Sequence, residues 1–178
     1  MRTGKFLEHL QALIRALSIQ DPVVAYTAVG RQASYAAYLV FDSLQWVHGS
    51  KAFTFAPDTY KSIAKNAARF WLLGLTFSLI SCAYKIRALR SRRIAALRPR
   101  ATAEKEAERK VELQQIKKEE EVVRWQMIQD ALDWINPATS AGFANFDDGA
   151  IGLAGTVTSI MGTYSQWQAV NGTSASKK

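Results

Sequence analysis

The sequence predicts an all-α fold, an integral membrane helical bundle, and three observations carry this prediction. Residues 3–18 place apolar side chains on one helical stripe, and residues 70–84 contain no charged side chain. Residues 149–176 are also uncharged and are rich in glycine. A long charged helix at 102–135 separates the two apolar helices, and the whole chain, 1–178, is expected to form a single membrane-associated helical domain.

The composition argues against several classes of protein. The chain has 23 Lys and Arg against 15 Asp and Glu, a net charge of +8. Its single cysteine, Cys82, excludes an internal disulfide. The two histidines, His9 and His48, are too few and too scattered for a metal site. Because no catalytic constellation or nucleotide motif is present either, no metal, cofactor or enzymatic activity is expected.

The first helix is predicted at 1–18 as an amphipathic helix. Its apolar residues recur at the spacing of one helical face, and polar residues lie off that face. The apolar face consists of Phe6, Leu7, Leu10, Leu13, Ile14 and Leu17. The same pattern also suits an ordinary helix that packs this face into a bundle.

An apolar helix is predicted next, at 22–48. Asp21 is a suitable N-cap and Pro22 fits the first helical position. Between Val23 and Phe41 the only charged residue is Arg31. Entry of this helix into the bilayer as a third or re-entrant segment is therefore left open.

The third predicted helix, 57–98, contains the apolar segment 70–84 and a basic end. Fifteen residues span about 22 Å as a helix, whereas the hydrocarbon core of a bilayer is about 30 Å thick. Arg69 and Lys85 bound the segment and can extend toward the headgroups, and local thinning can cover the remainder. We interpret 70–84 as a membrane span; the alternative is a buried helix of a soluble protein.

The basic end lies directly after this apolar segment, in residues 85–100, which hold seven basic and no acidic residues. Such a run is typical of a patch that faces anionic lipid. The predicted headgroup contacts are Arg87, Arg90, Arg92 and Arg93. Phosphate binding to nucleic acid is the alternative, but the run lacks interleaved aromatic residues, so no nucleic acid partner is expected.

The charged helix is predicted at 102–135, with Thr102 as its cap and its end at Asn136-Pro137. A narrow apolar stripe runs along its last turns: Val122, Trp125, Ile128, Leu132 and Ile135. This pattern favours a solvated helix whose distal end docks on the bundle. A coiled-coil or partner-binding helix is the alternative.

The glycine-rich stretch 148–170 is predicted to be a membrane helix, followed by a flexible tail at 171–178. Its glycine spacing does not fit a phosphate-binding loop, and its bulky apolar residues do not fit a linker. Small residues at helical spacing allow helices to approach closely in a bilayer. The predicted packing face comprises Gly152, Gly155, Ser159 and Gly162.

Four blocks of sequence together resemble the peroxin eleven family of peroxisomal membrane-elongation factors, in a fungal-type version. They are "RTGKFLEHLQAL" at 2–13, "VGRQASYAAYLVFDSLQWVH" at 29–48, "RFWLLGL" at 69–75 and "DDGAIGLAGTVTSIMGTYSQW" at 147–167. The resemblance implies a peroxisomal membrane protein that elongates the membrane before fission and forms a homo-oligomer. It also implies a fission adaptor and a dynamin-like GTPase as partners.

The resemblance further implies that the amphipathic helix inserts into anionic membrane. The face from Phe6 to Leu17 would enter the lipid, and Arg2, Lys5 and Arg15 would contact headgroups. Family members have a longer segment before this block, of roughly sixty residues, so Met1 is expected to be a truncated or alternative start.

Two functions follow as hypotheses. The first is a membrane-shaping protein that promotes peroxisome division by helix insertion and self-association. The second is an oligomeric pore for small metabolites, lined by polar residues of the last helix such as Thr156, Ser159 and Thr163. The side of the membrane that residues 85–131 face is left open, because the positive-inside rule and the resemblance disagree.

Overall fold

The computed structural model describes residues 4–97 and 103–172, and this part of the chain is all-α, as predicted. Its five helices are α1 (Lys5–Ala16), α2 (Pro22–Gly49), α3 (Pro57–Ala96), α4 (Ala103–Ala141) and α5 (Asp148–Asn171). Arg2, Thr102 and the end of the predicted tail, 173–178, lie outside the described residues.

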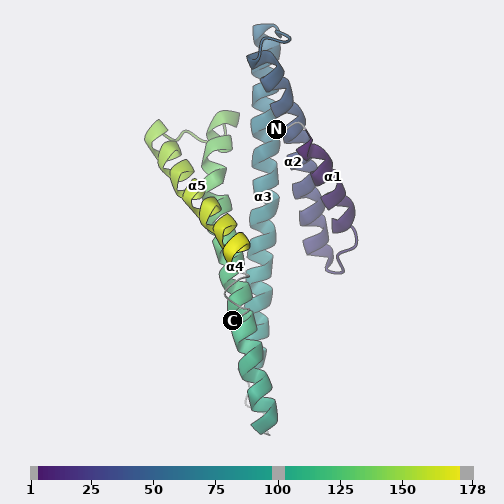
Figure 1. Cartoon of the computed structure of the whole chain (residues 1–178), viewed down its shortest axis with the longest axis vertical. Coiled ribbons are helices and arrows are strands. Elements are labelled where there is room, and N and C mark those ends of the chain that lie inside the picture. The colour runs from purple at the N-terminus through teal and green to yellow at the C-terminus, as the bar shows by residue number, and fades with distance from the viewer. Residues whose placement is uncertain (1–3, 98–102, 173–178) are drawn as a thin grey trace.

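The helices pack in chain order, each one against the next (Figure 1). The contacts join α1 to α2, α2 to α3, α3 to α4 and α4 to α5. The long helix α3 forms the centre, with α1 and α2 on one side and α4 and α5 on the other. The last turns of α3 and the first turns of α4 continue beyond the other helices as a hairpin.

The start of α2 confirms the predicted cap. The Asp21 carboxylate accepts hydrogen bonds from the backbone N–H groups of Val23 at 2.9 Å and Val24 at 3.1 Å. The Tyr84 hydroxyl of α3 donates to the other carboxylate oxygen at 3.0 Å. Bonding from Val24 N–H, and then from Tyr84 and Val23, lowers the pKa of Asp21. One side chain thus begins α2 and fixes it against α3.

Two glycines bring α2 and α3 close together. A Cβ atom at Gly30 of α2 would lie 2.7 Å from the Phe77 ring of α3. In reverse, a Cβ at Gly74 of α3 would lie 2.8 Å from the Tyr35 ring of α2. Each helix therefore places an aromatic ring where the other has no side chain. The sequence analysis singled out the glycines of the last helix and missed this pair.

The end predicted for the charged helix was wrong. Instead of stopping at Asn136-Pro137, α4 continues through Pro137 to Ala141. A proline within a helix removes one hydrogen bond, but Pro137 is fully buried and its neighbours remain helical. The helix ends at Gly142, whose positive φ of 83° lets Phe143 N–H bond to Ala138 O at 2.9 Å.

The face of α4 that contacts α3 follows a heptad spacing that polar residues conceal in the sequence. Buried positions of α4 include Ile116, Glu120, Asp130 and Pro137. Ile116 packs with Leu89 and Ala96 of α3 in a hydrophobic cluster. Because two of the inward positions are acidic, the apolar stripe read from the sequence identified a different face.

One described helix, α3, is long and apolar enough to cross a membrane, with a mean hydropathy of 1.4 in its most apolar window. About a third of that window is buried within the chain. The sequence analysis predicted a second such helix, but α5 does not reach the same hydropathy, since Gly, Ser, Thr and Gln dilute its apolar residues. Only the first of the two predicted membrane helices is therefore supported by composition.

Candidate functional site

Helix α1 has an unpartnered apolar stripe. Leu7, Leu10, Ile14 and Leu17 are exposed, with Ile14 and Leu17 each about two-thirds exposed. Phe6 and Leu13, which were predicted on the same face, are half-buried instead, next to the face that packs on α2. The apolar face predicted from the sequence is therefore wider than the exposed stripe. Lys5 and Arg15 are exposed near either end of the helix.

The opposite face of α1 rests on α2. His9 Nδ1 lies 2.6 Å from Gln32 Oε1, and the His9 ring lies 5.6 Å from the Tyr35 ring. Ala16 is buried at the end of the helix. Because Gly4, the N-cap residue, supplies no side-chain hydrogen bond, the first turn of α1 has no side-chain cap. The helix is thus held by one face and leaves its leucine-rich face open.

The predicted headgroup residues at the end of α3 fall into two groups. Arg87 and Arg90 are exposed and form no ion pair with any residue in the described ranges. Arg92 forms an ion pair with Glu119 at 3.1 Å, and Arg93 lies 3.8 Å from Glu120. Arg92 and Arg93 therefore connect α3 to α4. Arg87 and Arg90 keep their charges available to a surface.

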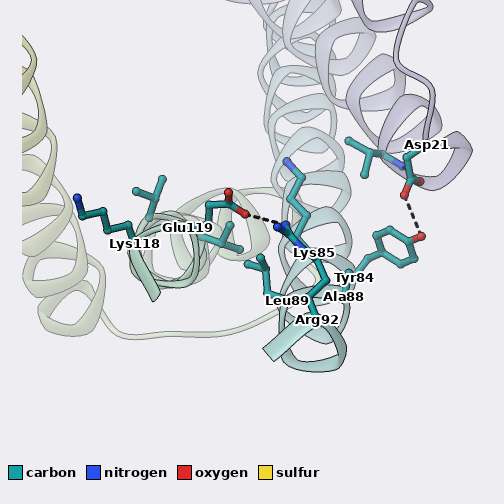
Figure 2. Close-up of a pocket in the computed structure, with 11 residues that line it drawn as sticks. Asp21, Tyr84, Lys85, Ala88, Leu89, Arg92, Lys118 and Glu119 are labelled. Carbon is teal, nitrogen blue, oxygen red and sulfur yellow. Dashed lines mark hydrogen bonds and ion pairs between the residues drawn. The ribbon is translucent and has the colours of Figure 1, made fainter. Parts of the chain in front are cut away.

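A groove lies where α2 begins, between α3 and α4 (Figure 2). Its volume is about 480 Å³. Apolar side chains form most of its wall, and Lys85, Arg92 and Lys118 are among its lining residues. Figure 2 shows Lys85 between the helices, Arg92 directed toward Glu119, and Lys118 extending away from Lys85. Lys85 was predicted from the sequence to bound the apolar segment and to begin the basic run, and its place in a groove was not predicted.

Of the predicted packing residues of α5, Gly152, Gly155 and Ser159 face away from the other described helices, and Gly162 alone lies next to α4. A Cβ atom at Gly152 or Gly155 would have no neighbour within 4 Å, and the one at Gly162 would lie 3.9 Å from Gln129. Ser159 is exposed and bonds to Gly155 O within its own helix. The α4-facing side of α5 is instead marked by its buried residues, Ala154, Thr158 and Met161. Gly152 and Gly155 are open to a second molecule.

Buried polar residues connect α3 to α4 within the segment predicted to span the membrane. Ser78 Oγ donates to Asp130 Oδ2 at 2.5 Å, and Gln126 Nε2 donates to Asp130 Oδ1 at 2.8 Å. Asp130 is 3% exposed. A buried carboxylate is retained when such donors satisfy it. This contact fixes the register of the two helices at the level of the apolar segment.

The fold and these surfaces define a helical protein with one candidate membrane span and an exposed amphipathic helix. The family model for Peroxisomal biogenesis factor 11 (PEX11) matches residues 1–167. The chain belongs to this family, as the sequence resemblance predicted.

Two relatives agree with this assignment. The peroxisomal membrane proteins PMP30A and PMP30B of Candida boidinii are each 27% identical over 184 residues, which covers 95% of this chain and 72% of each relative. No solved structure matches the chain. The predicted localisation, the peroxisomal membrane, is confirmed, and the broad role is in peroxisome biogenesis and proliferation.

Proposed function

We propose that this chain remodels and elongates the peroxisomal membrane by inserting α1 into one leaflet and by associating with further copies of itself. The exposed stripe on α1 carries the proposal. Leu7, Leu10, Ile14 and Leu17 share one side of the helix and are 42–66% exposed. A surface stripe of this kind is stabilised by transfer into lipid, and insertion into one leaflet favours curvature.

Insertion buries apolar surface that the fold leaves exposed. Complete burial of a Leu or Ile side chain contributes about 1.5–3 kcal/mol, so four of them contribute several kcal/mol. The hydrogen bond between His9 and Gln32 that helps hold α1 on α2 is worth about 0.5–1.5 kcal/mol. Because an interfacial helix lies along the membrane surface, α1 moves away from α2 about the loop 17–21 when it inserts.

Basic residues support this orientation. Lys5 and Arg15 on α1 are exposed, and so are Arg87 and Arg90 on α3. We assign these four side chains to anionic headgroups, where each contributes about 1 kcal/mol. Arg92 and Arg93 contribute less, because Glu119 and Glu120 already neutralise them.

Self-association is assigned to the open face of α5. Gly152, Gly155 and Ser159 lie on it at helical spacing, and no other helix of the described chain covers them. Two such faces can approach closely in a bilayer. The proposal also includes cooperation with a fission adaptor and a dynamin-like GTPase, which the family resemblance implies.

The test is tubulation of anionic liposomes by the full chain. Leu10→Glu combined with Ile14→Glu should abolish tubulation, because both side chains lie on the exposed stripe and neither is buried in the fold. Gln11→Glu combined with Gln20→Glu adds the same charge off the stripe and should tubulate like the parent. Tubulation by the Leu10 and Ile14 variant at the parental level would overturn the proposal.

A metabolite pore is the alternative, and the structure offers it little support. The hydroxyls of Thr156, Ser159 and Thr163 bond to carbonyl oxygens of their own helix, at 2.7–2.9 Å. Such bonds satisfy these groups without a water-filled lumen. Release of a small dye from the same liposomes, without tubulation, would favour the pore.

A further inference from the structure

Two neighbouring cavities lie between α2, α3 and α4. The outer one is the groove of about 480 Å³ in Figure 2, and the inner one measures about 320 Å³. They share the residues Val24, Lys85, Val122 and Val123 in their walls. Both volumes fall within the range of small-molecule sites. Because they share these residues, the two cavities lie next to each other.

The outer groove suits a hydrocarbon chain. Its wall includes Val24 of α2, Ala88 and Leu89 of α3, and Val122 of α4. Leu89 is buried at its base, whereas Val122 is 70% exposed at its edge. Covering such surface with an acyl chain is favourable in proportion to the apolar area removed from water.

A cationic side chain, Arg31, lines the inner cavity and interacts there with Tyr35. The Nε atom of Arg31 is buried and has no hydrogen-bond partner among the described residues. Its guanidinium lies 5.5 Å from the centre of the Tyr35 ring. The carboxylate at the same level, Asp130, already accepts hydrogen bonds from Ser78 and Gln126. A buried donor without a partner is unfavourable, and an anionic ligand within reach of Nε would remove this cost.

Lys85 adds a second cation at the junction of the two cavities. It forms no ion pair with a residue in the described part of the chain. The acidic residues of the groove are both engaged: Asp21 accepts from Tyr84, and Glu119 pairs with Arg92. The available charge in the cavities is therefore positive.

We propose that the two neighbouring cavities together bind a single-chain amphiphile with an anionic head, either a carboxylate or a phosphate. The head contacts Arg31 and Lys85, and the acyl chain lies along Val24, Leu89 and Val122. Arginine provides paired donors that match either head. This ligand site is separate from the α1 stripe and does not depend on membrane remodelling.

Cys82 provides a reporter within the site. It is the single cysteine of the chain, it is buried, and it lines the inner cavity. A bound head at Arg31 would therefore shield its thiol from a small alkylating reagent. The rate of alkylation measures occupancy directly, whatever the chain does to a membrane.

The experiment measures N-ethylmaleimide labelling of the full chain in phosphatidylcholine nanodiscs by mass spectrometry. Dodecyl phosphate or dodecanoate, at about ten times its Kd, should slow labelling of Cys82 about tenfold. The more effective of the two identifies the head. Three results would overturn the proposal. They are equal protection by dodecyltrimethylammonium, equal protection by inorganic phosphate alone, and no protection by either anionic amphiphile.

Variants of the site make the test specific. Arg31→Gln should reduce protection to less than about twofold, and Arg31→Lys should retain part of it. Lys61→Gln, an exposed control near the start of α3, should leave protection unchanged. Ala88→Trp fills the outer groove from an exposed position and should also abolish protection. Circular dichroism checks the helix content of each variant. If Arg31→Gln lowers the helix content, the test rests on Ala88→Trp instead. Protection of Cys82 in the Ala88→Trp variant at the parental level would overturn the proposal.

Discussion

At the scale of single residues, the environment of a glycine, rather than its frequency, decides its role. Gly152 and Gly155 lie in a glycine-rich run, yet a Cβ atom at either position would have no neighbour within 4 Å among the described residues. Gly30 and Gly74 lie in ordinary helical sequence, yet aromatic rings occupy the space beside them. The sequence alone could not distinguish these cases, because the ring that fills each space comes from another helix.

This contrast gives a first prediction. Gly30→Ala should destabilise the protein by about 1–3 kcal/mol, because the new Cβ would lie 2.7 Å from the Phe77 ring. Gly155→Ala, where the space is open, should be neutral or should stabilise the monomer by up to about 1 kcal/mol through helix propensity. Thermal unfolding in detergent measures both. Equal unfolding temperatures for the two variants would contradict the close α2–α3 contact.

At the scale of whole helices, the sequence predicted the number and order of elements well. The cap of α2 at Asp21 and the start of α3 at Pro57 were readable because capping chemistry is local. The end of α4 was not, since the burial of Pro137 against other helices is a tertiary effect. The α3-facing side of α4 was also missed, because Glu120 and Asp130 occupy inward positions and their partners are distant in sequence.

A second prediction concerns the contact of Asp130 with α3. Asp130→Ala should destabilise the protein by about 1–3 kcal/mol, because it leaves the Ser78 hydroxyl and the Gln126 amide without their acceptor. Asp130→Asn keeps one acceptor oxygen and should cost less. Chemical unfolding of the full chain in mild detergent compares the two. A cost for the asparagine variant as large as that for alanine would show that charge, rather than hydrogen bonding, stabilises this contact.

At the scale of the whole molecule, the apolar parts of the helices lie at one level. Segment 70–84 of α3 contacts α2 where Gly74 lies against the Tyr35 ring. It contacts α4 through the hydrogen bond from Ser78 to Asp130. Trp125 of α4 then contacts Tyr164 of α5, with ring centres 5.7 Å apart. The charged hairpin extends below this level in Figure 1. No single segment of the sequence shows this alignment, because it arises from the register of four helices.

This alignment predicts that the two ends of α3 lie on opposite sides of the membrane. In a Cys82→Ser background, Thr54→Cys lies before α3 and Lys110→Cys lies in the charged hairpin, and both positions are exposed. A membrane-impermeant thiol reagent added to intact peroxisomes should label one of them and spare the other until detergent is added. Labelling of both without detergent would contradict a spanning α3.

The packing of each helix on its sequence neighbour also bears on how the bundle forms. Within the described residues, each helix packs only on the helices before and after it in the sequence. Each interface can therefore form as soon as the later of its two helices has been synthesised. Contacts between sequence neighbours favour rapid folding with little chain entropy lost in long loops. The terminal helices α1 and α5 each complete one interface only. Either one can therefore detach while the interfaces among α2, α3 and α4 stay closed.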